Sequence, residues 1–287
     1  MKLDMRFLTS SAVVAAGLAA CAAALFAQWP DYPTTGPRTK EGKIDLTAPP
    51  PQTADGKIDF TGLWEPARGA GRGGAQAKGA PPPATPPVNN DDPPLGQFFN
   101  IGGGFKEGLP PLTPWAAQVR AQRKGDGNKD NPDAHCLPLG LTQLHMHPQP
   151  RKILQTRQAI VILYEANGNT RQILIDGRPL PKNDPSPWWY GYSVGHWEDD
   201  ALVVETTGFR DDVWLDVEGS PLTNTGKITE RWRRPTFGSM QIDITIEDPK
   251  AYTKPFTVRV NHRLMTDTEM MEFVCEERDA VHYVGKK

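Results

Sequence analysis

Residues 240–264 alternate apolar and polar side chains, and this pattern limits the fold more than any other feature of the sequence. Four apolar residues occupy every second position over 240–246. The same spacing recurs over 256–264, where His262 is the one polar residue in the apolar series. Successive side chains of a β-strand point to opposite faces, so each run predicts a strand with one buried and one exposed face.

A strong hairpin signal lies upstream of these strands. Asn167-Gly168 separates two alternating runs at 158–165 and 170–176. This dipeptide favours a two-residue turn, which would pair Ile162 with Ile173.

Two further tight turns are predicted at Asp199-Asp200 and at Thr266-Asp267, and the second would return the chain as a strand over 271–275 beside 256–264. About eight or nine strands joined by short turns make an up-and-down meander, which closes into a barrel or folds into a sandwich. Few helical patterns intervene, so the sequence predicts an all-β, antiparallel domain.

Residues 1–27 have the organisation of a cleaved secretory signal. A basic start precedes an apolar run over 7–26, and small residues lie near a cut after Ala27. The alternative is an outer-membrane lipoprotein lipidated at Cys21, although apolar residues follow that cysteine. Nothing later in the sequence resembles a membrane span. We therefore expect an exported protein, periplasmic or secreted.

Residues 28–112 are rich in Pro and Gly, and we expect an extended arm with a docking strand at 59–64. Thr113 followed by Pro114 predicts the start of one short helix. The β-domain is expected over 113–287.

The charge and the cysteine content of the chain bear on its binding partners and on its disulfides. The formal net charge is −2, which gives no electrostatic reason to expect nucleic-acid binding. After signal cleavage only Cys136 and Cys275 remain, and in an oxidising compartment two thiols most simply form one disulfide. Two separate buried thiols are the alternative. The sequence does not indicate an oligomeric state.

Short phrases of the chain resemble known exported proteins. Gly62-Leu63-Trp64 resembles the Gly-x-Trp signature of lipocalin-like barrels, which implies an up-and-down barrel around a small-molecule cavity. A series of phrases across the mature chain also resembles a family of exported bacterial proteins of unknown function. They are Asp59–Trp64, Leu112–Trp115, Cys136–Pro138, Asp176–Arg178, Trp197–Thr206, Glu230-Arg231 and Asp248–Pro255. This second resemblance implies export and a single domain, and it carries no catalytic residues.

Strand parity nominates a first candidate site. His262 shares the apolar face of its strand, and Glu230 shares a face with Ile228 and Trp232. If both faces point inward, an imidazole and a carboxylate lie inside the core, where burial is costly unless they are paired. We expect His262 within hydrogen-bond reach of Glu230 or of a ligand. The alternative is a purely structural pair.

The hairpin around Asp199-Asp200 nominates a second site, because one face combines polar and aromatic residues: Tyr190, Tyr192, His196 and Glu205. Inside a barrel that face would line a ligand pocket, and outside it would be ordinary surface. The neighbouring Trp188 and Trp189 would wall the pocket mouth or pack locally.

His145 and His147 form a third candidate, because alternate residues of a strand share a face and could bind one divalent metal. A solvent-facing pair is the favoured alternative, so no cofactor is predicted. No glycine-rich phosphate loop and no nucleophile elbow is present, which disfavours nucleotide chemistry and α/β-type serine hydrolysis.

These observations favour a lipocalin-like barrel that binds a small apolar or aromatic molecule, including Trp232 among its ligand contacts. The alternative is a cofactor-independent acid–base enzyme, a lyase, isomerase or hydrolase, using His262 with Glu230, or Tyr192 with His196. A third class is an envelope scaffold that docks through its Pro-rich arm.

Overall fold

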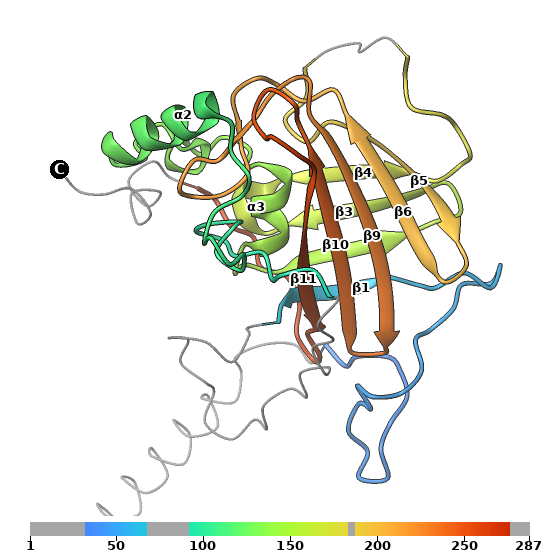
Figure 1. The fold of residues 1–287 in the computed structure, drawn as a ribbon. Helices are drawn as coiled ribbons and strands as arrows, with labels where there is room; N and C mark the ends of the chain where they lie inside the picture. Colours follow the sequence, from blue (N-terminus) through green and yellow to red (C-terminus); the bar gives the residue numbers. More distant parts are fainter. Residues whose placement is uncertain (1–31, 68–91, 183–186, 276–287) are drawn as a thin grey trace, which may run out of the picture.

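The computed structural model describes residues 32–67, 92–182 and 187–275. The predicted signal peptide and Cys21 lie outside these residues. Within them, nine strands close into one barrel (Figure 1), in the order β1-β11-β10-β9-β6-β5-β4-β3-β2. Their bounds are β1 Gly62–Pro66, β2 Arg151–Gln155, β3 Ala159–Tyr164, β4 Thr170–Leu174, β5 Tyr192–Glu198, β6 Ala201–Thr207, β9 Lys227–Thr236, β10 Ser239–Glu247 and β11 Phe256–Leu264. The all-β prediction is confirmed.

Two departures from a plain meander stand out. The pair β4–β5 is parallel, whereas every other pair in the barrel is antiparallel. The long connection between Leu174 and Tyr192 allows this, because parallel neighbours cannot be joined by a tight turn. Between β6 and β9 the chain leaves the barrel to form a small separate hairpin, β7 (Val213–Trp214) and β8 (Pro221–Leu222).

The barrel closes through a strand from the segment expected to be arm. β1 pairs with both β11 and β2, so residues 62–66 complete the wall. The return strand predicted over 271–275 is wrong: this segment is not a strand, and Met271 is 58% exposed. β1 occupies the edge of β11 that the return strand would have needed.

The hairpin β3–β4 has a different register from the one predicted. Ile160 lies opposite Ile173, and Ile162 lies opposite Arg171. The connection is longer than two residues, although Asn167 and Gly168 both adopt positive φ. Because the slip is by two residues, the inward face is unchanged, and Arg171 now faces the core.

Two α-helices accompany the barrel. α2 (Pro114–Gly125) begins where predicted, with the Thr113 side chain accepting a hydrogen bond from the Ala116 N–H. α3 (Leu141–Met146) was not predicted, and all six of its residues are buried. Short 3₁₀ turns, η1 (Pro132–His135) and η2 (Ala166–Gly168), complete the helical segments of the described chain. No helix in the described ranges is long and apolar enough to cross a membrane.

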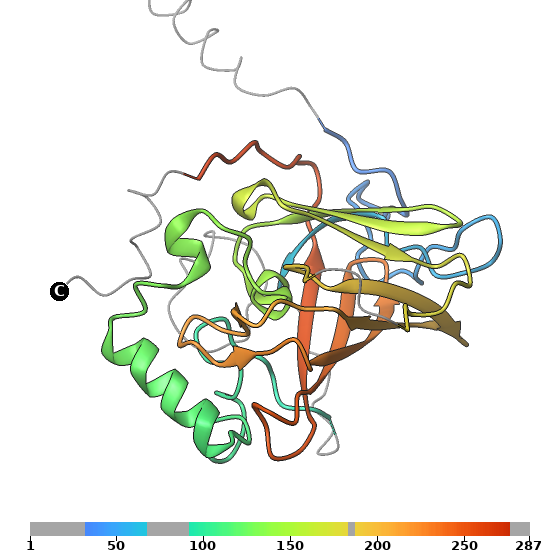
Figure 2. The same cartoon turned by 90° about the horizontal axis from the view of Figure 1, so that it is seen from above.

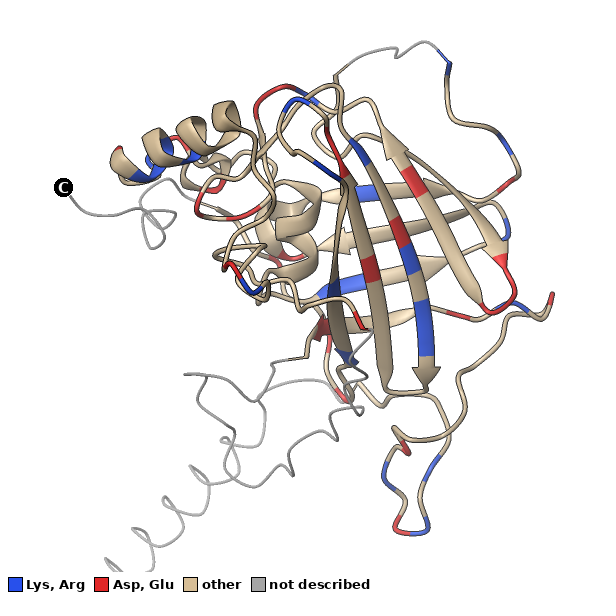
Figure 3. Cartoon of the chain, viewed as in Figure 1, with Lys and Arg blue, Asp and Glu red and all other residues tan. Residues whose placement is uncertain are grey.

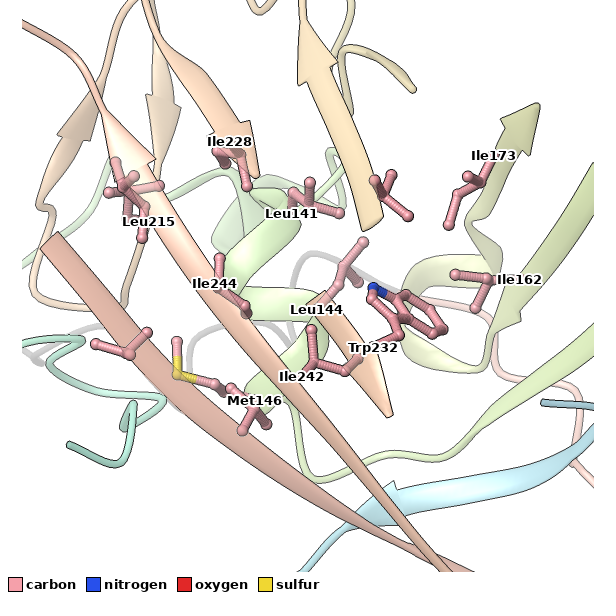
Figure 4. Close-up of a cluster of buried hydrophobic side chains, with 14 of the residues drawn as sticks. Leu141, Leu144, Met146, Ile162, Ile173, Leu215, Ile228, Trp232, Ile242 and Ile244 are labelled. Carbon is pink, nitrogen blue, oxygen red and sulfur yellow. The ribbon is translucent and has the colours of Figure 1, made fainter. Parts of the chain in front are cut away.

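α3 lies at one end of the barrel (Figure 2) and packs its apolar side chains into the buried core. Leu141, Leu144 and Met146 belong to the same buried cluster as Trp232 and Ile242 of the barrel wall (Figure 4). A helix fits here partly because it starts at a glycine: a Cβ on Gly140 would lie 1.9 Å from the Trp214 carbonyl oxygen.

Charged side chains alternate with this core on the outer faces of β9, β10 and β11 (Figure 3). Asp243 accepts hydrogen bonds from Arg233 at 2.8 Å and from Arg259 at 2.6 Å. The inner positions of the same strands are apolar except for Glu230 and His262, which lie near α3, and Arg234, which donates to the Phe237 and Asp59 carbonyls.

Cys136 and Cys275 form a disulfide, as predicted, with Cα atoms 5.5 Å apart. The bond ties the last described residue to the end of η1 and closes a long loop that contains most of the barrel.

Candidate functional site

A polar cluster lies inside the barrel where α3 meets the wall. Glu230 of β9 is at its centre and is completely buried. Its Oε1 accepts hydrogen bonds from His145 Nε2 at 2.7 Å, from Arg171 Nη1 at 3.1 Å and from Trp232 Nε1 at 3.2 Å. Arg171 also donates to Oε2. Glu230 is therefore inward, as strand parity indicated, but its histidine partner is His145.

His262 lies inside the barrel and is 1% exposed, yet it meets a different group. Its Nε2 lies 2.8 Å from Arg151 Nη1 and 2.9 Å from the His145 carbonyl oxygen, and the same Nη1 donates to that carbonyl at 2.9 Å. Arg151 Nη2 also donates to the His147 carbonyl at 3.2 Å. Arg151 thus closes the C-terminal end of α3, where cations are favoured by the helix dipole.

Burial and charge set the protonation states of this cluster. Burial alone would raise the pKa of Glu230, but the charges of Arg171 and His145 outweigh it and lower the pKa well below its ordinary value. Burial lowers the pKa of His145, although Glu230 opposes this. Burial, with the nearby Arg151 charge, also lowers the pKa of His262. At neutral pH Glu230 is ionised and both imidazoles are neutral.

The ionised Glu230 fixes the tautomer of His145. His145 must carry its proton on Nε2 to donate to the Glu230 carboxylate, so its buried Nδ1 is an acceptor with no hydrogen-bond partner among the described residues. His262 Nε2 lies within hydrogen-bond distance of both a donor, Arg151 Nη1, and an acceptor, the His145 carbonyl oxygen, and its buried Nδ1 likewise has no partner among the described residues. A carboxylate that orients an imidazole with a free second nitrogen is the arrangement that general bases use.

The solvent-facing arrangement expected for His145 and His147 is wrong, because both side chains are buried. His145 and His147 lie on and just after a helix, where residues two apart do not share a face. His147 is 4% exposed, and burial and the Arg151 charge lower its pKa to about 3. The described part of the chain contains no group of three His, Cys, Asp or Glu side chains suited to a metal ion.

The polar face of the β5–β6 hairpin lies outside the barrel. His196 is exposed, and its Nε2 lies 3.2 Å from Glu198 Oε1. Glu205 Oε1 accepts a hydrogen bond from Lys227 Nζ at 2.5 Å. Tyr192 is half-buried beside Arg178 on the same outer side. The inner face holds Trp197, Leu202 and Val204 instead, because the apolar set decides which side faces the core.

Trp232, which was expected to touch a ligand, is fully buried in the core. Its ring packs edge-on against Phe60 at 5.7 Å and against His145 at the same distance. Tyr190 is half-buried, with its ring 6.5 Å from Tyr164. Both tyrosine hydroxyls are buried without a hydrogen-bond partner among the described residues, and burial raises the pKa of both.

An open pocket of about 380 Å³ lies on the surface beside α2. We call it the aromatic pocket. Its lining comes from the second half of α2, the segment around η1, Trp189 and β7: Val119, Gln122, Arg123, Asp126, Asp130, Pro132, Leu137, Trp189, Asp212 and Trp214. Trp188, by contrast, is 48% exposed, pairs with Phe209 and does not line the pocket.

Cations cover part of both tryptophans of the aromatic pocket. The Arg123 guanidinium lies 4.4 Å from the Trp214 ring, and that of Arg210 lies 4.4 Å from the Trp189 ring. Arg210 in turn donates to both carboxylate oxygens of Asp212 at 2.9 Å. These contacts hold the ring planes in place.

Sequence reasoning missed Arg171 and Arg151. Both shared the parity of inward isoleucines, Arg171 with Ile173 and Arg151 with Ile153, so the signal was present in the alternation. It also missed most residues of the aromatic pocket, because they come from segments that are far apart in the sequence, around 119–137, 189 and 212–214.

Comparisons with known proteins identify no relative of this chain. No family model matches the chain, and neither a search of curated proteins nor one of solved structures finds a match.

Proposed function

We propose that this chain is an exported barrel protein that binds a small apolar or aromatic molecule in the aromatic pocket. The observation that carries the proposal is the pocket itself, whose volume of about 380 Å³ falls within the range of small-molecule sites. Trp189 and Trp214 supply aromatic surface, and Val119, Pro132 and Leu137 supply aliphatic surface.

The barrel interior offers less support for a ligand site. In a lipocalin-like barrel the ligand would occupy the middle of the barrel. Here α3 covers one end of the barrel and brings Leu141 and Leu144 into the buried cluster that the inward side chains of the wall form. A ligand on the outside, at the end of the barrel where α2 and η1 lie, requires no movement of the core.

Export accords with the disulfide, because such bonds persist in oxidising compartments. Sequencing the N-terminus of protein recovered from the periplasm or medium tests this part. We expect the mature chain to begin at Gln28. A lipid-modified Cys21 would instead place the protein on a membrane surface.

Indole is a suitable first probe because it is a neutral aromatic ring. We expect saturation-transfer NMR to show indole bound to the wild-type protein and lost in Trp189→Ala. Trp188→Ala is the matched control, since Trp188 lies next in sequence but outside the pocket. Equal indole signals from wild type and Trp189→Ala would refute binding in this pocket.

A second candidate function, acid–base catalysis, is favoured by one observation: the oriented His145 with its free Nδ1. A working base must be reached by another molecule. Modification of neutral imidazoles by diethyl pyrocarbonate, mapped by mass spectrometry, tests access, with exposed His196 as the internal control. Modification of His145 in the folded protein would support catalysis, and its complete protection while His196 reacts would argue against it.

A further inference from the structure

We infer that the aromatic pocket selects organic amines, meaning ligands that join an apolar or aromatic ring to a positively charged amino group. This inference rests on the proposed function and adds the chemical class of the ligand. It stands on the combination of an aromatic wall, an open cavity and unpaired negative charge on one side of that cavity.

The charges of the lining are unbalanced. Three carboxylates and one guanidinium line the pocket. Asp212 is already paired with Arg210, which lies just behind Trp189. Asp126 and Asp130 form no ion pair with any described residue, and both belong to the loop that follows α2. Two carboxylates are thus available to a bound cation.

Arg123 is the one lining group that opposes a cation. Its Nη1 donates to the Gly219 carbonyl at 3.0 Å, and its guanidinium lies over Trp214. Burial lowers the pKa of Arg123 to about 10, so the group remains charged at neutral pH. Its charge is engaged by a carbonyl dipole and an aromatic face and is also stabilised by Asp216, Asp212 and Asp130, so it offsets part of the attraction that Asp126 and Asp130 exert on a bound cation.

The end of α2 contributes one carboxylate, that of Asp126, to the pocket. The pocket is lined by Val119, Gln122 and Arg123 from the second half of this 12-residue helix, and by Asp126 at its C-cap. The carbonyls of its last turn already accept hydrogen bonds from the chain that follows the helix, and Arg123 and Lys124 lie in that turn, so the helix end itself adds no attraction for a cation. A ligand amine between α2 and Trp189 would therefore meet the carboxylates of Asp126 and Asp130, while its ring packs on the aromatic wall.

A second pocket provides an internal contrast. It has a volume of about 270 Å³, lies around Trp197 and carries Lys57 and Arg157 against a single carboxylate, Asp55. Lys57 Nζ lies 5.7 Å from the Trp197 ring. An anionic aromatic probe has more reason to bind there than in the aromatic pocket, so the test must separate the two sites.

The test uses three probes that share one ring: tryptamine as the cation, indole as the neutral molecule and indole-3-acetate as the anion. Affinities are measured by isothermal titration calorimetry on the full mature protein with its disulfide intact. We expect tryptamine to bind about fivefold more tightly than indole, the size of an exposed ion-pair effect, with the preference reduced by added salt. Indole-3-acetate should bind the aromatic pocket most weakly of the three probes. Its binding in this pocket is the difference between the titration heat of the wild-type protein and that of Trp189→Ala.

The variant Asp126→Asn with Asp130→Asn removes both free carboxylates with little change of shape. We expect it to bind tryptamine and indole equally well, so that the ratio of the two affinities falls to about one. The matched control is Asp199→Asn with Asp200→Asn, which makes the same change of net charge in the turn between β5 and β6. This control should keep the full tryptamine preference.

The outcomes separate the two proposals. If indole binds in a Trp189-dependent way but tryptamine binds no more tightly, the amine inference is refuted and the proposed function stands. A tryptamine preference that survives in the Asp126 and Asp130 variant also refutes it, because the charge then comes from elsewhere. If none of the probes binds the wild-type protein, the proposed function itself fails.

Discussion

Mild acid should destabilise this protein through three buried imidazoles, those of His145, His147 and His262. Each is at most 4% exposed, and burial lowers the pKa of each. In the unfolded chain a histidine titrates near pH 6.5. Below that pH the unfolded state therefore binds more protons than the folded state, and stability falls as the pH falls.

The expected magnitude follows from proton linkage. One such imidazole removes about 1.4 kcal/mol of the free energy of unfolding per pH unit below 6.5. Between pH 7 and pH 5 His147, whose pKa in the folded protein is about 3, loses about 2 kcal/mol, and His145 and His262 add losses of the same sign. A typical domain is stable by about 5–15 kcal/mol, so the effect is large. Glu230 adds nothing in this window, because its lowered pKa affects stability only below its ordinary value of 4.5.

Asp216 works in the other direction and must be separated from the imidazoles. Burial raises the pKa of this carboxyl group, so the folded state gains protons there as the pH falls. A difference measurement removes its contribution. We choose His147→Gln, because the pKa of His147 falls to about 3 and because Gln can still accept from the Gln149 N–H, which lies 3.2 Å from the imidazole.

The assay is urea unfolding followed by far-UV circular dichroism from pH 7 to pH 4.5. His147→Gln should be about 1 kcal/mol less stable than wild type at pH 7, from lost packing. Its stability should fall less steeply below pH 6.5, by about 1.4 kcal/mol per pH unit, so the two curves cross near pH 5.5. His196→Gln, at an exposed site, should follow the wild-type slope. Equal slopes for wild type and His147→Gln would refute the reasoning.

Three other perturbations follow from the fold. Replacing both disulfide cysteines by alanine opens a loop with a sequence separation of 139 and should lower the free energy of unfolding, measured in urea, by roughly 4–5 kcal/mol. Thiol titration of the denatured, unreduced wild-type protein should find no free thiol among Cys136 and Cys275. Arg171→Met leaves the buried Glu230 carboxylate without its guanidinium partner and should lower the free energy of unfolding by about 3–5 kcal/mol. The double variant Arg171→Met with Glu230→Leu should lose less, and thermal unfolding of both variants measures the difference. Gly140→Ala places a Cβ 1.9 Å from the Trp214 carbonyl oxygen and should lower the Tm sharply, whereas Gly125→Ala meets open space and should not.

Alternation predicted the barrel wall well, because each strand has one face against the core. The parity of His262 and Glu230 placed both side chains inside, and both are buried. Parity does not give the partner, however. Register and topology decide which inward groups meet, and here a helix that parity could not place inserts His145 beside Glu230.

α3 escaped prediction because its local sequence contradicts its environment. Thr142, Gln143 and His145 are polar, yet all are fully buried, since each bonds to a distant group. Thr142 Oγ1 donates to the Leu215 carbonyl at 2.6 Å, and Gln143 Nε2 donates to the Trp214 carbonyl at 3.1 Å. The alternation His145-Met146-His147 favoured a strand, but these long-range bonds decide the local conformation.

The aromatic pocket was equally out of reach of pattern analysis. The sequence predicts a pocket role for Trp189 only because this residue precedes a strand. Trp214, Asp126 and Asp130 come from other segments, and the long connection between β6 and β9 brings β7 to them. No spacing in the sequence links residues around 126 to residues around 214, so only the folded chain brings them together.

The contacts of α3 explain why the ligand site is more plausible outside the barrel than inside it. To empty the barrel, the chain would have to break the bonds of Thr142 and Gln143, the His145–Glu230 pair and the bonds from Arg151 to the end of the helix. Neutral bonds of this kind contribute about 1 kcal/mol each and charged ones about 1.5–3 kcal/mol. Exposing the buried leucines and methionine of α3 adds about 2 kcal/mol for each side chain. The total exceeds the roughly 8 kcal/mol that a micromolar ligand gains on binding. A molecule of that affinity could not displace α3, whereas the aromatic pocket is already open to it.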